Sequence, residues 1–374
     1  MKKTKIIIAS ILKPIDDTRM FEKLGLSLAK TNKYEVNIIG FISKNTLDND
    51  SITFYSHGPF QRTSILRFLS CWKVFKSYIK LKPDVIICNT HELLIVTFLY
   101  RILFGAKIIY DIRENYVKNI KNTNVFSPAL KPFLAAYVRS KELLTKPFFH
   151  GFMLAERIYA QQLRFVPKSK SVVIENKYFG KELIEKRKTE KIKKDITLLY
   201  SGTISDSNGV FDAIRITEQL HELDSSIKLK IIGYCALKRD LLRLKESVEG
   251  KDFIELIGGD YLVPHDQIVE EIKNADFGFV LKKLNQGIND DKLLTRLFEY
   301  TANHLPILLL ENPTWIQFCE EFNAAVTLNP EKIDAETLLQ MMKTSNFYTK
   351  GDTKNSLWIS EETKFLDFIS TFNS

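Results

Sequence analysis

Cysteine is scarce in this chain of 374 residues, and none of the cysteines has metal-binding or disulfide spacing. No C-x-x-C pair occurs among Cys71, Cys88, Cys235 and Cys319, and Cys88 and Cys235 lie in or beside apolar segments. Closely spaced cysteines are the usual sign of a zinc site or a disulfide framework. The sequence therefore predicts reduced structural thiols, as in a cytoplasmic protein.

Long apolar runs are also missing, since none reaches the roughly 20 residues that cross a bilayer. The most apolar segment, residues 93–110, is interrupted by Arg101 and Lys107. The N-terminal MKKTKIIIASILKP has basic residues before an apolar run, like a secretory signal, but it lacks a small-residue cleavage site. We therefore expect a first β-strand there and no membrane-spanning helix.

The chain has no internal repeat of about 20–50 residues and no helix-turn-helix, zinc-finger or RNP motif. Its charge, however, is unevenly distributed. The first 190 residues carry 33 Lys and Arg against 16 Asp and Glu, and the remaining residues carry 21 against 29. A basic half favours a phosphate-rich partner. Because nucleic-acid modules are absent, we expect an anionic membrane surface rather than nucleic acid.

Apolar strands alternate with amphipathic helices along both halves, a pattern that predicts parallel α/β sheets. At 45% apolar content the chain is long enough for two cores. Residues 181–195 are almost wholly charged, which is typical of a linker. We predict two Rossmann-like doubly wound domains, residues 1–180 and 196–350, and a capped C-terminal helix within 351–374.

Residues 287–310 combine a polar loop, a helix from about Asp291 to Asn303 and an apolar strand over 307–310. Arg296 and Glu299 share one face of that helix, with Arg296 nearer its N-terminus. A cation in that position is unfavourable unless an anion meets it. A phosphate beside Arg296 and a diol on Glu299 would satisfy both, as a nucleotide does. The alternative is a solvated ion pair between the two side chains.

The run TRLFEYTANHLPIL resembles the "K-L/F-x-E-Y-x-A-x-G-x-P-V" segment of retaining glycosyltransferases of the family 4 type, which have the two-domain GT-B fold. The resemblance implies that Arg296 contacts the donor pyrophosphate and that Glu299 binds the ribose hydroxyls. The first acid of the family's E-x7-E pair corresponds to Asp291, which by resemblance is a catalytic residue at the donor sugar.

The stretch ITLLYSGTISDSNGVFDAIRI resembles the family's "Y-x-G-x-x-x-x-K-G" turn, with Gly202 and Gly209 in place. Glycine there lets a phosphate approach backbone N–H groups at a helix N-terminus. The family's Arg and Lys are replaced around Thr203 and at Asn208, which removes two cations from the donor site. Two lysines after the predicted strand 277–281 could help Arg296: Lys282 and Lys283.

The first domain resembles the family in two loops. The family's "D-x-R-h" matches Asp17 and Arg19, and its "I-Y-D-x-H-E-x-Y" matches a strand that ends in Asp111, with Glu114 following. By resemblance these four residues line the acceptor side of the cleft. A structural network between Arg113 and Glu114 is the alternative.

His91 follows the apolar strand 85–88, and binding residues gather at the carboxyl ends of such strands. In the family a histidine near this point can lie beside the donor sugar, through its ring or its backbone, so His91 is a second catalytic candidate. The alternative is that His91 and Glu92 only cap the following helix.

The resemblance implies transfer of a sugar from a UDP- or GDP-linked donor to a glycan or lipid-linked hydroxyl acceptor, with retention of configuration, as in bacterial polysaccharide biosynthesis. The two domains would face an interdomain cleft, and the C-terminal helix would cross back to the first domain. No cofactor or metal is expected, because no Asp-x-Asp follows a strand. A GT-B sugar-nucleotide epimerase and a non-catalytic partner subunit are the alternatives.

Residues 118–150 interleave cations with aromatic and aliphatic residues, as a helix lying on a bilayer does. Packing against the sheet would account for most of the apolar residues, but not for the cations. We therefore expect a cytoplasmic protein that is peripheral on the inner face of the membrane through this segment. The cations are Lys118, Lys121, Lys131, Arg139, Lys141 and Lys146.

Overall fold

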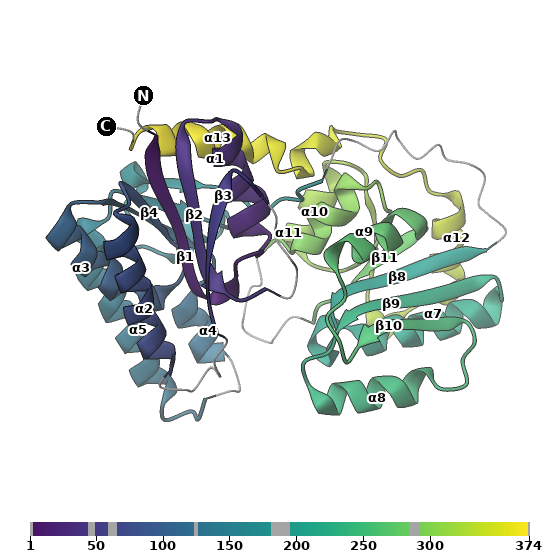
Figure 1. The fold of residues 1–374 in the computed structure, drawn as a ribbon. Coiled ribbons are helices and arrows are strands. Elements are labelled where there is room, and N and C mark those ends of the chain that lie inside the picture. The colour runs from purple at the N-terminus through teal and green to yellow at the C-terminus, as the bar shows by residue number, and fades with distance from the viewer. Residues whose placement is uncertain are drawn as a thin grey trace. The chain divides into compact units, whose positions relative to one another are not determined.

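The computed structural model describes residues 3–43, 49–58, 66–122, 126–180, 195–283 and 292–372. It divides into two compact units, Met1–Phe179 with Trp358–Ser374, and Gly180–Leu357. Each unit is built on one parallel sheet with flanking helices (Figure 1), which confirms the predicted two-domain α/β fold. The predicted linker lies outside the described residues except for Asp195.

The first sheet has seven parallel strands in the order β3-β2-β1-β4-β5-β6-β7. The edge strand β3 is not predicted from the sequence, because only its first residue, Ile52, is buried. The strands are β1 (Thr4–Pro14), β2 (Tyr34–Phe41), β3 (Ile52–His57), β4 (Val85–Cys88), β5 (Lys107–Ile112), β6 (Gly151–Leu154) and β7 (Ser171–Val173).

Helices cover both faces of this sheet. The main ones are α1 (Leu26–Lys30), α2 (Leu66–Leu81), α3 (Leu94–Phe104), α4 (Tyr116–Asn122), α5 (Lys131–Thr145), α6 (Tyr159–Gln162) and α13 (Ile359–Ser370). Short turns of other helix types are η1 (Arg19–Gly25, π-helical), η2 (His91–Leu93), η3 (Lys146–Phe148) and η4 (Lys168–Lys170). Residues 19–30 thus form a π-helical segment followed by one α-helical turn.

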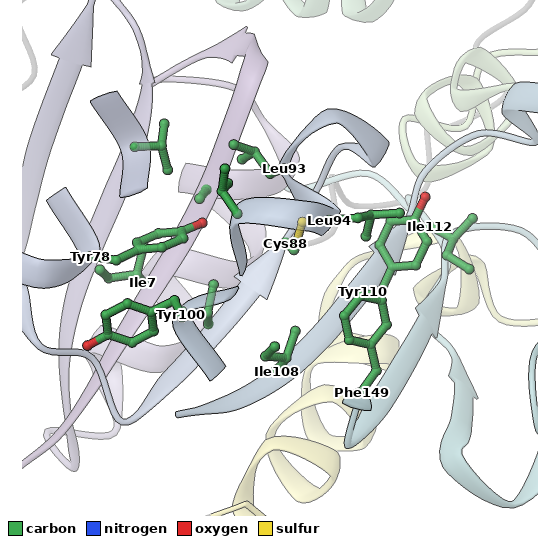
Figure 2. Packing of buried hydrophobic residues seen from close by; sticks show 14 of the residues in the cluster. Ile7, Tyr78, Cys88, Leu93, Leu94, Tyr100, Ile108, Tyr110, Ile112 and Phe149 are labelled. Carbon is green, nitrogen blue, oxygen red and sulfur yellow. The ribbon is translucent and has the colours of Figure 1, made fainter. Parts of the chain in front are cut away.

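Two cores hold these layers together. On one face α2 and α3 pack on the sheet, where the rings of Tyr78 and Tyr100 lie 5.6 Å apart beside Ile7 (Figure 2). On the other face the C-terminal segment joins η1 and α1. There the Trp358 indole N–H donates to the Ser27 hydroxyl at 2.9 Å, and Phe365 is fully buried. The last part of the chain is thus an integral layer of the first unit.

The second sheet has six parallel strands in the order β10-β9-β8-β11-β12-β13. They are β8 (Ile196–Thr203), β9 (Ile227–Tyr234), β10 (Ile254–Gly259), β11 (Phe277–Val280), β12 (Ile307–Leu310) and β13 (Ala325–Leu328). Helices are α7 (Val210–Leu223), α8 (Lys238–Val248), α9 (His265–Asn274), α10 (Thr295–Ala302), α11 (Pro313–Glu320) and α12 (Ala335–Thr344), with turns η5 (Asp206–Asn208), η6 (Pro330–Lys332) and η7 (Thr353–Ser356).

Both sheets share one topology, in which the strand order reverses once. The reversal lies between β1 and β4 in the first sheet and between β8 and β11 in the second. In open parallel sheets, ligands bind outside the carboxyl ends of the strands at such a reversal. Among the described helices, none combines the length and the apolar character needed to cross a bilayer.

We predict that Trp358→Ala lowers the free energy of unfolding of the first unit by about 3–5 kcal/mol, because it leaves a large cavity and removes the hydrogen bond that the Ser27 hydroxyl accepts, while Ser27 still donates to Glu362. Urea unfolding followed by circular dichroism measures the change. The neighbouring Ile359 is 57% exposed, so Ile359→Ala is the matched control and should shift stability by no more than about 0.5 kcal/mol. Equal losses in the two variants would contradict the layer role of the C-terminal segment.

Candidate functional site

Helix α10 carries Arg296 and Glu299, the two side chains predicted to bind a nucleotide. It begins at Thr295, and Leu294 before it is extended with ψ 139°, so the predicted start near Asp291 is wrong for the described residues 292–294. The Trp315 indole N–H donates to the carbonyl of Lys292 at 2.9 Å, which holds that backbone outside the helix. Asp291 itself, the predicted catalytic acid, lies outside the described residues.

Arg296 reaches the carboxyl ends of the two strands that flank the reversal of strand order. Its Nη1 donates to the carbonyl of Phe279 in β11 at 3.4 Å, and its guanidinium lies 4.8 Å from the centre of the Tyr200 ring of β8. A Cβ at Gly202, where φ is +95°, would stand 3.0 Å from Arg296 Nη2. Glycine at this position therefore lets the guanidinium approach the strand backbone.

The charge of Arg296 is not balanced by a direct ion pair in the described part of the chain, where no carboxylate pairs with it. Burial opposes its charge, but Tyr300, Tyr200 and Glu299 raise its pKa, so the side chain stays cationic. A half-buried cation without a counter-ion is costly unless an anion binds. The predicted phosphate position is consistent with this geometry.

Glu299 pairs with a histidine that the sequence analysis does not identify. Its Oε1 lies 3.1 Å from Nε2 of His265, the first residue of α9. The alternative interpretation, an ion pair between Arg296 and Glu299, is absent from the described contacts. The second carboxylate oxygen of Glu299 makes no hydrogen bond within the described chain. One oxygen is thus anchored, and the other can accept from a ligand hydroxyl.

His265 could have been found only by position. It opens a helix after β10, at the same carboxyl edge as Gly202, and polar residues there are candidates for binding. The contact with Glu299 cannot be predicted from the sequence, because the two residues are 34 positions apart. Tyr200 is the first letter of the glycine-turn motif, but the motif does not reveal that its ring supports Arg296.

The turn after β8 is held by hydrogen bonds, and it has Thr203 and Asn208 where the family has cations. Tyr200 donates its hydroxyl to the carbonyls of Thr203 at 3.1 Å and Asn208 at 3.2 Å, and the Asn208 amide donates to Thr203 at 3.1 Å. Gly209 has φ +80°, and a Cβ there would collide with the carbonyl of Leu281. Asp206, in this turn, adds a negative charge.

The lysines expected to compensate are differently placed. Lys283 pairs with Asp206 at 2.9 Å and with Asp212 at 3.4 Å, and its hydrogen bond lowers the pKa of Asp206. Lys283 is therefore occupied by Asp206 of the turn and Asp212 of α7. Lys282 is half-buried and has a partner of its own, and its help to Arg296 stays a prediction.

His91 does not offer a free ring nitrogen. Its Nδ1 lies 3.0 Å from Lys141 Nζ, and its Nε2 lies 3.0 Å from Glu92 Oε1, which also binds Arg67. Burial lowers the pKa of His91. Burial would raise the pKa of Glu92, but His91 and Arg67 lower it to about 2. Both ring nitrogens are thus engaged by side chains, so the ring is more than a simple helix cap, and its catalytic use stays a prediction.

The predicted acceptor-side residues satisfy one another. Arg19 and Asp111 are fully buried and form two hydrogen bonds, at 2.8 and 2.7 Å. Arg113 binds Asp17 at 2.7 Å rather than Glu114, and this lowers the pKa of Asp17 although burial opposes it. These contacts give Arg19, Asp111 and Asp17 a structural role, and their acceptor-side role stays a prediction. Glu114, half-buried, accepts a hydrogen bond from Asn119 at 2.8 Å.

No group of three or more His, Cys, Asp or Glu side chains within the described ranges could hold a metal ion. The four cysteines are free thiols, all of them buried.

No protein-family model matches the sequence, and no curated protein matches it. Solved structures do match along the whole chain. Sucrose-phosphate synthase from Thermosynechococcus elongatus is 12% identical, covers 99% of each chain and has a TM-score of 0.71. Alr3699/HepE from Anabaena, in complex with UDP, is 12% identical over 98% of this chain and 100% of that chain, with a TM-score of 0.62.

A Listeria monocytogenes structure assigned as a UDP-N-acetylglucosamine 2-epimerase is 11% identical over 99% of this chain and 96% of that chain, with a TM-score of 0.61. At such identities the likeness establishes the fold, which is the two-domain GT-B architecture. The activity has to be argued from the site.

We predict that Asp111→Asn lowers the free energy of unfolding by about 3–5 kcal/mol, because it leaves the buried Arg19 charge unpaired. Nucleotide affinity, measured by calorimetry below the unfolding transition, should stay unchanged. Replacing the exposed Asp266 of α9 by Asn is the control and should leave stability unchanged. A folded, fully stable variant would instead restore Asp111 to an acceptor role.

Proposed function

We propose that this chain is a retaining glycosyltransferase of the GT-B type that transfers a sugar from a UDP- or GDP-linked donor to a glycan or lipid-linked hydroxyl. One observation carries the proposal: at the strand-order reversal of the second sheet, beside the glycine-lined end of β8, Arg296 is a cation that pairs with no carboxylate of the described residues. A diphosphate supplies the missing anion, with charge-assisted hydrogen bonds to the guanidinium.

Glu299 supports a nucleotide rather than a bare phosphate. It lies on α10 one helical turn beyond Arg296, and its unbonded carboxylate oxygen can accept from a ribose hydroxyl while His265 holds the other oxygen. The Anabaena structure with the same fold binds UDP. Arg296 would stabilise the leaving diphosphate electrostatically as the bond to the sugar breaks, and we propose that no metal ion is required.

An epimerase is the second candidate, because the Listeria structure assigned to that activity shares the fold over nearly the whole chain. A non-catalytic subunit is the third, because the turn after β8 carries Asp206 and lacks the family's cations. Incubation with UDP- and GDP-sugars, with EDTA and without acceptor, separates the three. Slow release of nucleoside diphosphate and free sugar indicates a transferase, an epimerised nucleotide sugar indicates an epimerase, and no turnover indicates the subunit.

We predict that Arg296→Gln weakens binding of the matching nucleoside diphosphate by about tenfold to a hundredfold, because a charge-assisted contact to phosphate is lost. Isothermal titration calorimetry gives the affinities. Binding of the nucleoside without phosphates should be the same in both proteins. Arg239→Gln, at a side chain that is 85% exposed in the same unit, is the control, and an equal loss in that variant would contradict the assignment.

Glu299→Ala should lose about tenfold or more in affinity for the same nucleotide, the size of a hydrogen-bond pair to a charged group. The 2′,3′-dideoxy nucleotide, which has no ribose diol, should bind the variant and the original protein equally well. Unchanged affinity for the normal nucleotide would remove the ribose role. Glu320→Gln on the exposed side of α11 serves as the control.

A further inference from the structure

Helix α5 exposes its large apolar side chains and buries small or polar ones, the opposite of an ordinary surface helix. Its buried residues are small or polar: Ala135, Val138, Lys141, Glu142 and Thr145. Its large apolar residues face outward instead, with Phe133 74%, Tyr137 50% and Leu144 62% exposed. A surface helix normally places its large apolar side chains toward the core. The outward face of α5 therefore calls for a partner.

The exposed apolar surface continues over the neighbouring helices. Helix α3 packs against both α2 and α5, and all three lie on the side of the first sheet opposite α13 (Figure 1). At the end of α3, Leu103 is 64% exposed, and on α2 Trp72 is 52% exposed. We call this surface the outer face. Its large exposed apolar residues are Leu69, Trp72, Ile79, Ile102, Leu103, Phe104, Phe133, Tyr137, Leu143 and Leu144.

The charge on the outer face has one sign. Lys73, Lys76 and Lys80 are exposed along the same side of α2 as Trp72, and within the described chain none of them forms an ion pair. Helices α2 and α3 contain no Asp or Glu, and Glu142, the one acid of α5, is buried. The outer face thus offers cations and apolar side chains without exposed carboxylates on its three helices.

We propose that the outer face docks this protein on an anionic lipid bilayer. The lysines would meet anionic headgroups, the large apolar side chains would enter the headgroup–acyl boundary, and Trp72 and Tyr137 are of the amphipathic type that prefers this boundary. A second copy of the chain fits less well. Pairing of two outer faces would bring unpaired lysines together with no carboxylate to receive them.

This surface differs from the one expected from residues 118–150. Arg139 lies 4.5 Å from the centre of the Phe165 ring and pairs with Glu142 at 3.0 Å, and Lys141 contacts His91. These two cations point inward and are explained by packing, contrary to the expectation. The apolar residues of α5 face outward, and the cations come from α2. The proposal needs no nucleotide site, so it can fail or hold independently of the proposed function.

The test is sedimentation of the full-length protein with vesicles of phosphatidylcholine containing about 30% phosphatidylglycerol, compared with pure phosphatidylcholine, at low and high salt. We expect retention by the anionic vesicles at low salt and at least a tenfold lower partition coefficient on pure phosphatidylcholine. The triple variant Lys73→Gln, Lys76→Gln, Lys80→Gln should lose at least tenfold on anionic vesicles. The double variant Phe133→Ser, Leu144→Ser should lose as much on them.

The control for the lysines is Lys238→Gln, Lys332→Gln, Lys350→Gln, and the control for the apolar pair is Leu242→Ser, Leu262→Ser. All five of these residues are exposed in the second unit, and these variants should bind vesicles as the original protein does. Circular dichroism checks that each variant is folded. Lack of retention at low salt, or unchanged binding of both outer-face variants, overturns the proposal. A dimer in light scattering that Phe133→Ser, Leu144→Ser dissociates also overturns it, since the face would then join two copies.

Discussion

The reversal of strand order in each parallel sheet is the constraint on which the chemistry of this fold depends. At a reversal, the chain leaves two adjacent strands in opposite directions. No connection therefore passes over the carboxyl ends of those two strands, and a crevice remains there. Side chains or a ligand must then satisfy the exposed backbone. The chain meets this constraint twice, at β1/β4 and at β8/β11, and it resolves the two cases differently.

In the first sheet the reversal is closed from within. Arg19 enters from η1, forms two bonds with Asp111 at the end of β5, and donates a third to the carbonyl of Ile174 at 3.0 Å. A buried ion pair of this kind is tolerable only when each partner is hydrogen-bonded. Asn89, after β4, completes the set with a bond to Asp111 at 2.9 Å. The resulting network leaves little demand for a ligand.

In the second sheet three glycines stand in register at the carboxyl edge. They are Gly202 in β8, Gly233 in β9 and Gly258 in β10. A Cβ on Gly233 would collide with the carbonyl of Gly202, and a Cβ on Gly258 would collide with the carbonyl of Gly233. Small residues here let Arg296 reach the backbone from outside. Its partners are a carbonyl and an aromatic ring, so its charge remains to be compensated. The same topology therefore gives a reversal filled by the protein's own side chains in one domain and a reversal that can accept an anion in the other.

The sequence predicts the elements whose pattern is local. Strands 85–88 and 307–310 are predicted with the bounds they have, because each is a short apolar run. The alternation of strands and helices predicts both sheets. At the site it predicts Arg296 and Glu299 as one face of a helix, since their spacing is intrinsic to that helix.

Contacts between distant segments are what the sequence does not predict. Asp17 and Arg113 are 96 residues apart, and His265 and Glu299 are 34 apart, so periodicity says nothing about either pair. The sequences of the loops that carry Asp17, Arg19 and Asp111 do not tell whether these side chains bind an acceptor or bind one another. Only the fold decides, by bringing β1 and β5 on either side of β4.

Helix α5 shows the same limit for an apolar stripe. Its sequence contains two apolar sets, one around Ala135 and Val138 and one around Phe133, Tyr137 and Leu144, and either could face the sheet. Full burial of a Phe or Leu side chain stabilises by about 1.5–3 kcal/mol, so hydrophobicity alone favours the larger set inside. With the smaller set inside, Glu142 and Lys141 contact Tyr110 and His91 in the layer below. The large side chains are left outside as a consequence, where burial in a bilayer would recover the free energy that the fold forgoes.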